Sequence, residues 1–192
     1  MARTLQDLQI AMANTMQSST QTVLDHCLSV NSCFWVLVDH LQQGTEIPGW
    51  WKIPAWAKAM ADLLDQDSDT ISEYLCFHDC GKPFCQTTDD SGATHFPNHA
   101  RVSHDIWIEA GGSAEVALLM LHDMDFHTMR ADTMEAFCSL PFTPTLMLAG
   151  LAEIHANAEL FGGPDSPGFK IKCEHAKRRG GQAARLILEK RK

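Results

Sequence analysis

A histidine and an aspartate stand side by side at the end of an apolar stretch, in the run YLCFHDCGKP at positions 74–83. Presented together, the imidazole of His78 and the carboxylate of Asp79 offer a divalent cation one nitrogen and one oxygen ligand. Gly81 then turns the chain, so the ammonium group of Lys82 can return toward the same place. The run therefore predicts a metal site with a phosphate-binding lysine attached.

Further histidines stand where they could complete such a site. His26 lies on the apolar face of an expected helix, and His99 stands at the start of another. His122 and Asp123 repeat the His-Asp pair after an apolar run, where Asp123 could be a ligand or could orient one. His155 lies within a long expected helix. Because metal sites in helical bundles take ligands from several helices that point inward, these residues are candidates for one shared centre.

The elements that must position these side chains are helices. Helical periodicity dominates, and no alternating run is long enough to propose a sheet, so we expect an all-α fold. The length suits a single domain over 1–192, with a core over about 20–161 and a C-terminal loop and basic helix over 162–192. A polar loop is expected over 83–98, with a turn signal at 89–92. Helices are expected over the ranges 4–17, 20–42, 54–65, 68–79, 98–110, 113–122, 130–139, 143–161 and 174–190.

The charge of the chain limits its partners. A formal net charge of −9 argues against a broad surface for duplex DNA or for an anionic membrane, since both need an excess of cations. The longest uncharged apolar stretch, residues 27–38, is too short to span a bilayer. Seven cysteines without a CxxC pair, and an opening without a signal segment, favour reduced thiols and a cytoplasmic protein.

Cations gather near the C-terminus. The segment 166–172 alternates lysine with apolar residues, and it could supply Lys170 and Lys172 to a phosphate, with Arg178 on the next helix. Equally, the apolar residues of this segment could anchor a loop while the lysines face water. Lys82, Lys170, Lys172 and Arg178 are therefore the candidate substrate-binding residues.

Several short motifs occur together in a recognisable order. HDCGKP at 78–83, DSG at 90–92, HFPNH at 95–99 and LHDMDFH at 121–127 resemble the HD module of bacterial CCA-adding tRNA nucleotidyltransferases, over about residues 20–160. The resemblance implies a single HD-domain helical bundle of the HD phosphohydrolase superfamily. In that family the module is a metal-dependent phosphohydrolase acting on 2′,3′-cyclic and monoester phosphates. The sequence holds no nucleotidyltransferase half, so only the hydrolytic chemistry is expected to carry over.

The resemblance also implies a ligand set. HD proteins follow the order H…HD…H…H…D, and where the last aspartate is expected this chain has LAEIHANAE at 151–159. His155 is the preferred replacement and Asn157 the second choice, because imidazole is the better ligand for a first-row transition ion. One or two divalent ions (Mn, Fe, Co, Ni or Zn) are expected, with Asp79 between them. The implied ligands are His26, His78, Asp79, His99, His122 and His155.

These features together predict an enzyme, an HD-type metal-dependent phosphohydrolase for a small phosphorylated substrate, a nucleotide or an RNA end. Metal-activated water would attack phosphorus while Asp79 bridges the ions and Lys82 steadies the developing charge. Two alternatives stay open. One is an HD-fold di-iron oxygenase with the same ligand order. The other is a non-catalytic nucleotide- or RNA-binding module whose metal site is disabled by the change at 155–157.

Overall fold

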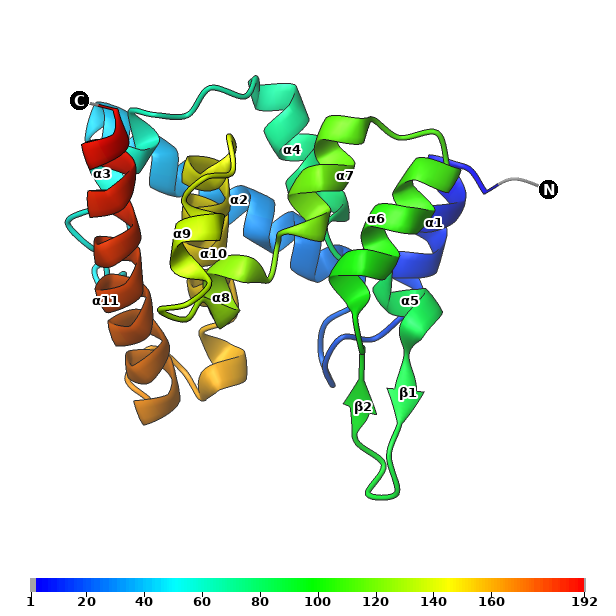
Figure 1. The fold of residues 1–192 in the computed structure, drawn as a ribbon. Coiled ribbons are helices and arrows are strands. Elements are labelled where there is room, and N and C mark those ends of the chain that lie inside the picture. The colour runs from blue at the N-terminus through cyan, green and yellow to red at the C-terminus, as the bar shows by residue number, and fades with distance from the viewer. Residues whose placement is uncertain (1–2, 192) are drawn as a thin grey trace. The chain divides into compact units, whose positions relative to one another are not determined.

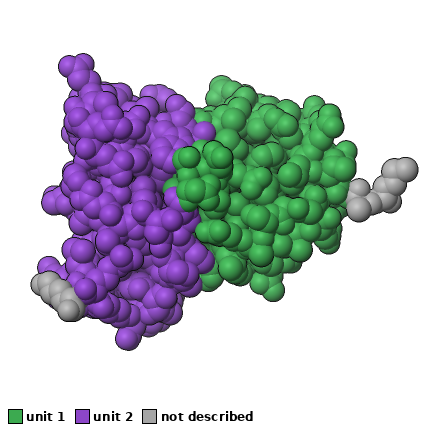
Figure 2. Space-filling model, turned by 90° about the horizontal axis from the view of Figure 1, so that it is seen from above, with its two compact units in different colours: residues 1–29, 67–123 green, residues 30–66, 124–192 purple. Residues whose placement is uncertain are grey.

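A computed structural model describes residues 3–191 and consists mainly of α-helices (Figure 1), which confirms the expected all-α class. The chain divides into two compact units, shown in Figure 2. Unit 1 comprises residues 1–29 and 67–123, and unit 2 comprises residues 30–66 and 124–192. A single domain over the whole length stays a prediction. No helix within the described residues has both the length and the hydropathy that crossing a membrane requires.

Unit 1 contains the candidate ligands that precede residue 124. Within it α7 packs against both α4 and α6, α6 also contacts α5, and α5 contacts α1. The second half of α2 belongs to unit 2. The elements of unit 1 are α1 (Leu5–Ala13), the first residues of α2 (Val23–Gln43), α4 (Ser68–Phe77), α5 (Lys82–Cys85), β1 (Thr87–Thr88), β2 (Thr94–His95), α6 (His99–Glu109) and α7 (Ala114–Leu121).

Two helices of unit 1, α2 and α4, begin at side chains that satisfy their first backbone N–H groups. Thr22 Oγ1 accepts a hydrogen bond from the N–H of Asp25, and the Asp25 carboxylate accepts one from the N–H of Thr22. Asp67 likewise accepts from the N–H groups of Asp69 and Thr70 at the start of α4. These hydrogen bonds fix where α2 and α4 begin. His26 lies in the first turn of α2, and His78 directly follows α4.

The segment 83–98 is more ordered than the expected polar loop. It contains most of α5 and a two-stranded antiparallel ribbon, with Thr87 opposite His95, that leads into α6 (Figure 1). The expected turn at 89–92 is present, because Asp89 accepts hydrogen bonds from the N–H groups of Ser91 and Ala93. The loop prediction was wrong for the rest because elements of two to four residues are shorter than any detectable period.

Unit 2 is built around α10, which is buried along nearly its whole length and contacts α3, α8 and α11. A helix that is apolar all round is typical of a core position. The prediction that a loop precedes residue 174 was wrong, since α11 begins at Pro167, with Ser166 accepting a hydrogen bond from the N–H of Phe169. The elements are the second part of α2, α3 (Ala57–Ala61), α8 (Asp125–Thr128), α9 (Met134–Phe137), α10 (Thr143–Ala156), the short 3-10 helix η1 (Glu159–Phe161) and α11 (Pro167–Lys190).

Candidate metal centre

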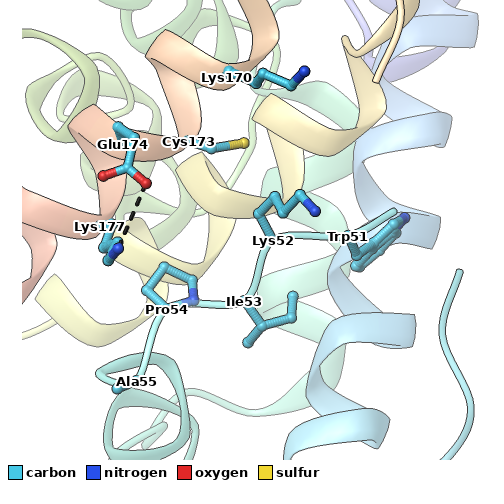
Figure 3. Close-up of a pocket in the computed structure, with 9 residues that line it drawn as sticks. All are labelled: Trp51, Lys52, Ile53, Pro54, Ala55, Lys170, Cys173, Glu174 and Lys177. Carbon is cyan, nitrogen blue, oxygen red and sulfur yellow. Dashed lines mark hydrogen bonds and ion pairs between the residues drawn. The ribbon is translucent and has the colours of Figure 1, made fainter. Parts of the chain in front are cut away.

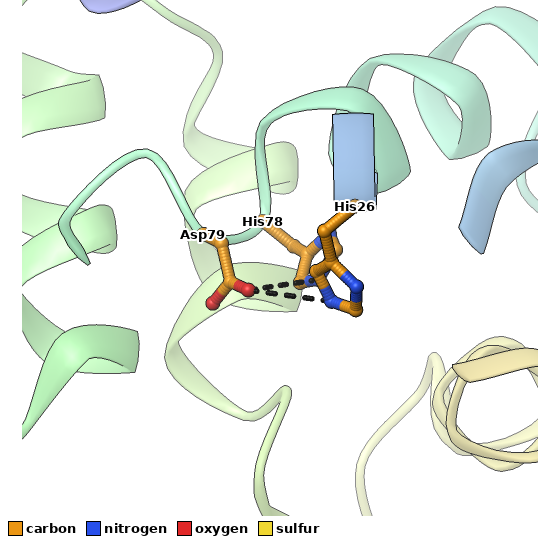
Figure 4. A group of neighbouring side chains, drawn as sticks. All are labelled: His26, His78 and Asp79. Carbon is orange, nitrogen blue, oxygen red and sulfur yellow. Dashed lines mark ion pairs between the residues drawn. The ribbon is translucent and has the colours of Figure 1, made fainter. Parts of the chain in front are cut away.

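Two imidazoles approach one buried carboxylate oxygen in unit 1 (Figure 4). The Nε2 atoms of His26 and His78 lie 3.5 and 3.4 Å from Oδ2 of Asp79. All three residues are at most 2% exposed, and their donor atoms lie within 4.8 Å of one another. Two donors that are each about 2.1 Å from an ion at a tetrahedral angle are about 3.4 Å apart. His26, His78 and Asp79 therefore have the spacing of ligands around one metal ion.

A third imidazole faces the other oxygen of the same carboxylate. Nε2 of His99 lies 3.6 Å from Oδ1 of Asp79, whereas His26 and His78 approach Oδ2. The His99 side chain is 18% exposed, so this side of the group is the more open one. A carboxylate with a different imidazole at each oxygen is suited to bridge two ions.

Backbone carbonyls orient two of these rings. Nδ1 of His78 lies 2.8 Å from the carbonyl oxygen of Leu75, and Nδ1 of His99 lies 3.0 Å from that of Phe96. An Nδ1–H that donates to a carbonyl leaves the lone pair on Nε2 for a metal ion. Nε2 of His78 is buried and has no hydrogen-bond partner among residues 3–191, which is a costly arrangement unless a ligand satisfies it.

The turn after Asp79 explains the glycine of the motif. α4 ends at Phe77, and the chain then turns into α5 with Gly81 against the first turns of α6. A Cβ at Gly81 would lie 2.4 Å from the backbone nitrogen of Ser103 and 2.8 Å from the carbonyl oxygen of His99. Only glycine permits this close approach, and the approach brings His99 to Asp79.

Charges around Asp79 keep it ionised. Burial by itself would raise the pKa of its carboxyl group. The ammonium group of Lys82, 2.5 Å from Oδ2, outweighs burial, and the imidazoles of His78, His26 and His99 act in the same direction, so the pKa is held well below its usual range. The carboxylate is thus available as an anionic ligand throughout the physiological pH range.

The opposite shift applies to His78. Burial favours the neutral ring, but Cys27, Asp79 and Asp123 outweigh it and raise the pKa well above its ordinary value. Asp123 is itself buried and accepts a 2.5 Å hydrogen bond from the hydroxyl of Tyr74. A pocket that favours a proton on His78 favours positive charge in general, and a metal ion would have to displace that proton.

Lys82 is positioned by two contacts. Its Nζ donates to Asp79 Oδ2 and, at 2.8 Å, to Oε1 of Gln17, and it lies 5.5 Å from the centroid of the Phe96 ring. The residue is 8% exposed, which is unusual for a lysine. Sequence reasoning missed Gln17, because no motif surrounds it and a loop closed by the Met16–Thr22 bridge carries it to the site. Contact of Lys82 with a phosphate stays a prediction.

The remaining candidate ligands have other surroundings. His122 directly follows α7 and is half-buried, and its role as a ligand stays a prediction. His155 lies in unit 2, where Nε2 accepts a hydrogen bond from the N–H of Lys52 at 3.0 Å and Nδ1 lies 2.8 Å from the Leu151 carbonyl. Asn157 donates to Glu153. Metal ligation by His155 stays a prediction. Binding of an ion at Nε2 would break its hydrogen bond from the N–H of Lys52.

The three predicted phosphate-binding cations beyond Lys82 all lie on α11 in unit 2 and are exposed. Nζ of Lys172 lies 5.5 Å from the centroid of the Phe161 ring. Lys170 and Lys172 lie in the first two turns of α11, whereas the expected helix began only at residue 174. Their role, and that of Arg178, in substrate binding stays a prediction.

Comparisons with known proteins found no match to this chain. No family model matches the chain, and no curated protein or solved structure matches it either. What the geometry supports directly is a buried His26, His78 and Asp79 group that could hold a metal ion.

Proposed function

We propose that this chain is a metal-dependent phosphohydrolase of the HD type. The observation that carries the proposal is the carboxylate of Asp79, with imidazoles at both of its oxygens and the ammonium group of Lys82 2.5 Å from Oδ2. Possible metal ligands and a lysine that could bind a phosphate thus meet at the side chain of Asp79. Phosphoryl transfer needs both, since charge develops on the phosphoryl oxygens while water attacks.

Each residue has a distinct part in this proposal. One or two transition-metal ions (Mn, Fe, Co, Ni or Zn) would supply an activated water and Lewis acidity when bound. His26, His78 and Asp79 would hold the first ion, and His99 with Oδ1 of Asp79 would contribute to a second. Lys82 balances the negative charge of Asp79 and, in this proposal, would donate a hydrogen bond to a phosphoryl oxygen beside it.

The distribution of charge favours a small substrate. Unit 1 holds only three of the 15 lysines and arginines of the chain, namely Arg3, Lys82 and Arg101. Of these, Lys82 alone contacts Asp79. A surface with so few cations does not neutralise a long phosphate backbone. The proposed substrate is therefore a nucleotide or the terminal phosphate of an RNA, recognised locally at the metal centre.

The main rival is an HD-fold oxygenase that uses two irons. The observation in its favour is the nitrogen-rich surroundings of Asp79, because three imidazoles suit iron as well as manganese or zinc. The two functions differ in what they consume. Iron in the purified protein together with oxygen uptake would favour the oxygenase, whereas phosphate release with redox-inert zinc would exclude a need for oxygen.

The test is phosphate release by the full-length protein loaded with manganese, cobalt, nickel or zinc. Substrates are p-nitrophenyl phosphate, 2′,3′-cyclic nucleotides and nucleoside monophosphates. We expect turnover that Asp79→Asn abolishes and that His95→Ala, a change of an exposed histidine in the same unit, leaves intact. No phosphate release from any substrate, while the protein demonstrably holds metal, would refute hydrolysis.

A further inference from the structure

Unit 2 has a cavity of its own between residues 51–55 and α11, with a volume of about 610 Å³. Figure 3 shows Trp51 at one end of this space and Glu174 with Lys177 at the other. Sites for small molecules span about 300–1,000 Å³, so the cavity has the size of a ligand site. Every residue that lines it belongs to unit 2.

The wall formed by residues 51–55 is held in place by ring contacts and a backbone hydrogen bond. Trp51 stacks on His155 with ring centroids 4.7 Å apart and an interplanar angle of 29°. The N–H of Lys52 donates to Nε2 of that same imidazole, and Trp50 packs edge-on against Phe169 at 5.7 Å. A wall anchored in this way loses little entropy when a ligand binds.

The lining carries an excess of positive charge. It includes Lys52, Lys170 and Lys177 against one acid, Glu174, whose carboxylate lies 3.5 Å from Lys177. Within residues 3–191 no acidic group forms an ion pair with Lys52 or Lys170. Two uncompensated ammonium groups in one cavity attract a dianion.

The α11 side of the cavity includes a buried thiol. Cys173 is 7% exposed, and burial raises the pKa of its thiol to about 11, although Lys52 acts to lower it. Cys173 and Lys52 line the same cavity (Figure 3), and the charge of Lys52 acts on the thiol through space. Because the thiol stays neutral near pH 7, it does not cancel the charge of Lys52.

We propose that this cavity binds a nucleoside monophosphate, with its phosphate at Lys52 and Lys170 and its base against Trp51. A phosphate monoester carries the two negative charges that the two lysines can neutralise. A planar base suits the indole and the apolar side chains of Ile53 and Pro54 beside it. The inference concerns unit 2 alone and does not depend on the hydrolytic function proposed for unit 1.

Calorimetric titration of the full chain with AMP and with UMP tests the proposal. A chelator is present throughout, so that the metal centre contributes nothing and failure here leaves the hydrolytic proposal untouched. We expect saturable binding that weakens as salt rises from about 0.1 M to about 0.5 M. Inorganic phosphate alone and adenosine alone should each bind at least about tenfold more weakly, since each offers one half of the contacts.

Matched variants locate the site. Lys52→Ala together with Lys170→Ala should weaken AMP binding at least about tenfold while keeping the backbone hydrogen bond to His155. Lys58→Ala, an exposed lysine of the same unit that pairs with Asp62, should leave affinity unchanged. No saturable binding of AMP or UMP, an equal loss in Lys58→Ala, or inorganic phosphate binding as tightly as AMP would overturn the proposal.

Discussion

The backbone N–H of Gly81 donates a 2.9 Å hydrogen bond to Oγ of Ser103, which joins the turn after Asp79 to α6. Both groups are buried, so the bond and the close packing around it hold His99 and Asp79 at their observed separation. The glycine of the motif is therefore a packing requirement of the metal centre.

Gly81→Ala should destabilise the protein by about 1–3 kcal/mol, because the new Cβ would meet backbone atoms of Ser103 and His99 that cannot move aside. The measurement is unfolding by denaturant. Gly49→Ala is the control, since a Cβ there meets nothing within 4 Å. Equal stability of the two variants would show that α5 and α6 do not pack as described.

Lys82→Met should move acid unfolding of the metal-free protein to higher pH. In the wild type the pKa of Asp79 is lowered on folding, so its contribution to stability is full above the unfolded pKa of about 3.9 and is lost as pH falls toward the folded value. Removing the ammonium group 2.5 Å away raises the folded pKa and so reduces this contribution. The variant is then less stable above about pH 3.9, so its acid midpoint lies at higher pH.

The same variant should cost about 3–5 kcal/mol near neutral pH, since a buried carboxylate loses its cation. Circular dichroism along an acid titration, with chelator present, gives the midpoint. Lys58→Met, which breaks an exposed pair with Asp62, serves for comparison and should leave the midpoint in place. Coincident midpoints for the two variants would contradict the coupling of Lys82 to Asp79.

Metal affinity should fall as pH decreases from about 8 to about 6, because the raised pKa of His78 means that a proton competes with the ion for Nε2. Titration calorimetry with zinc in buffers of different ionisation enthalpy counts the protons released. We expect net release on binding. Affinity that does not change over this range, with no protons released, would argue against His78 as a ligand.

His99→Ala should reduce the number of bound ions while leaving one in place, because His99 faces Oδ1 of Asp79 whereas His26 and His78 face Oδ2. Metal content per chain is measured after dialysis. His104→Ala, on the same helix and partnered by Asp105, is the matched control. Equal metal content in wild type and His99→Ala would leave a single-ion centre as the better description.

The sequence predicted the helical class and the approach of His26 and His99 to the His78-Asp79 pair. Long amphipathic helices are recognised by their period, whereas the ligand set followed from a resemblance in motif order and stays a prediction.

Other features had no signal in the sequence. The contact of Gln17 with Lys82 depends on how a loop folds back, and no local pattern encodes that. The start of α11 was misplaced because a loop was expected from residue 162 to the helix at 174–190, although proline is favoured in the first turn of a helix after a capping serine. A Pro-Gly pair can therefore end a helix or stand in its first turn, and the packing of the folded chain decides which of the two occurs.

The most direct test of the central claim is anomalous scattering from crystals of the protein loaded with zinc. We expect a zinc peak about 2.0–2.2 Å from Nε2 of His26, Nε2 of His78 and a carboxylate oxygen of Asp79. A zinc peak elsewhere, with these three side chains arranged as described but binding no ion, would contradict it.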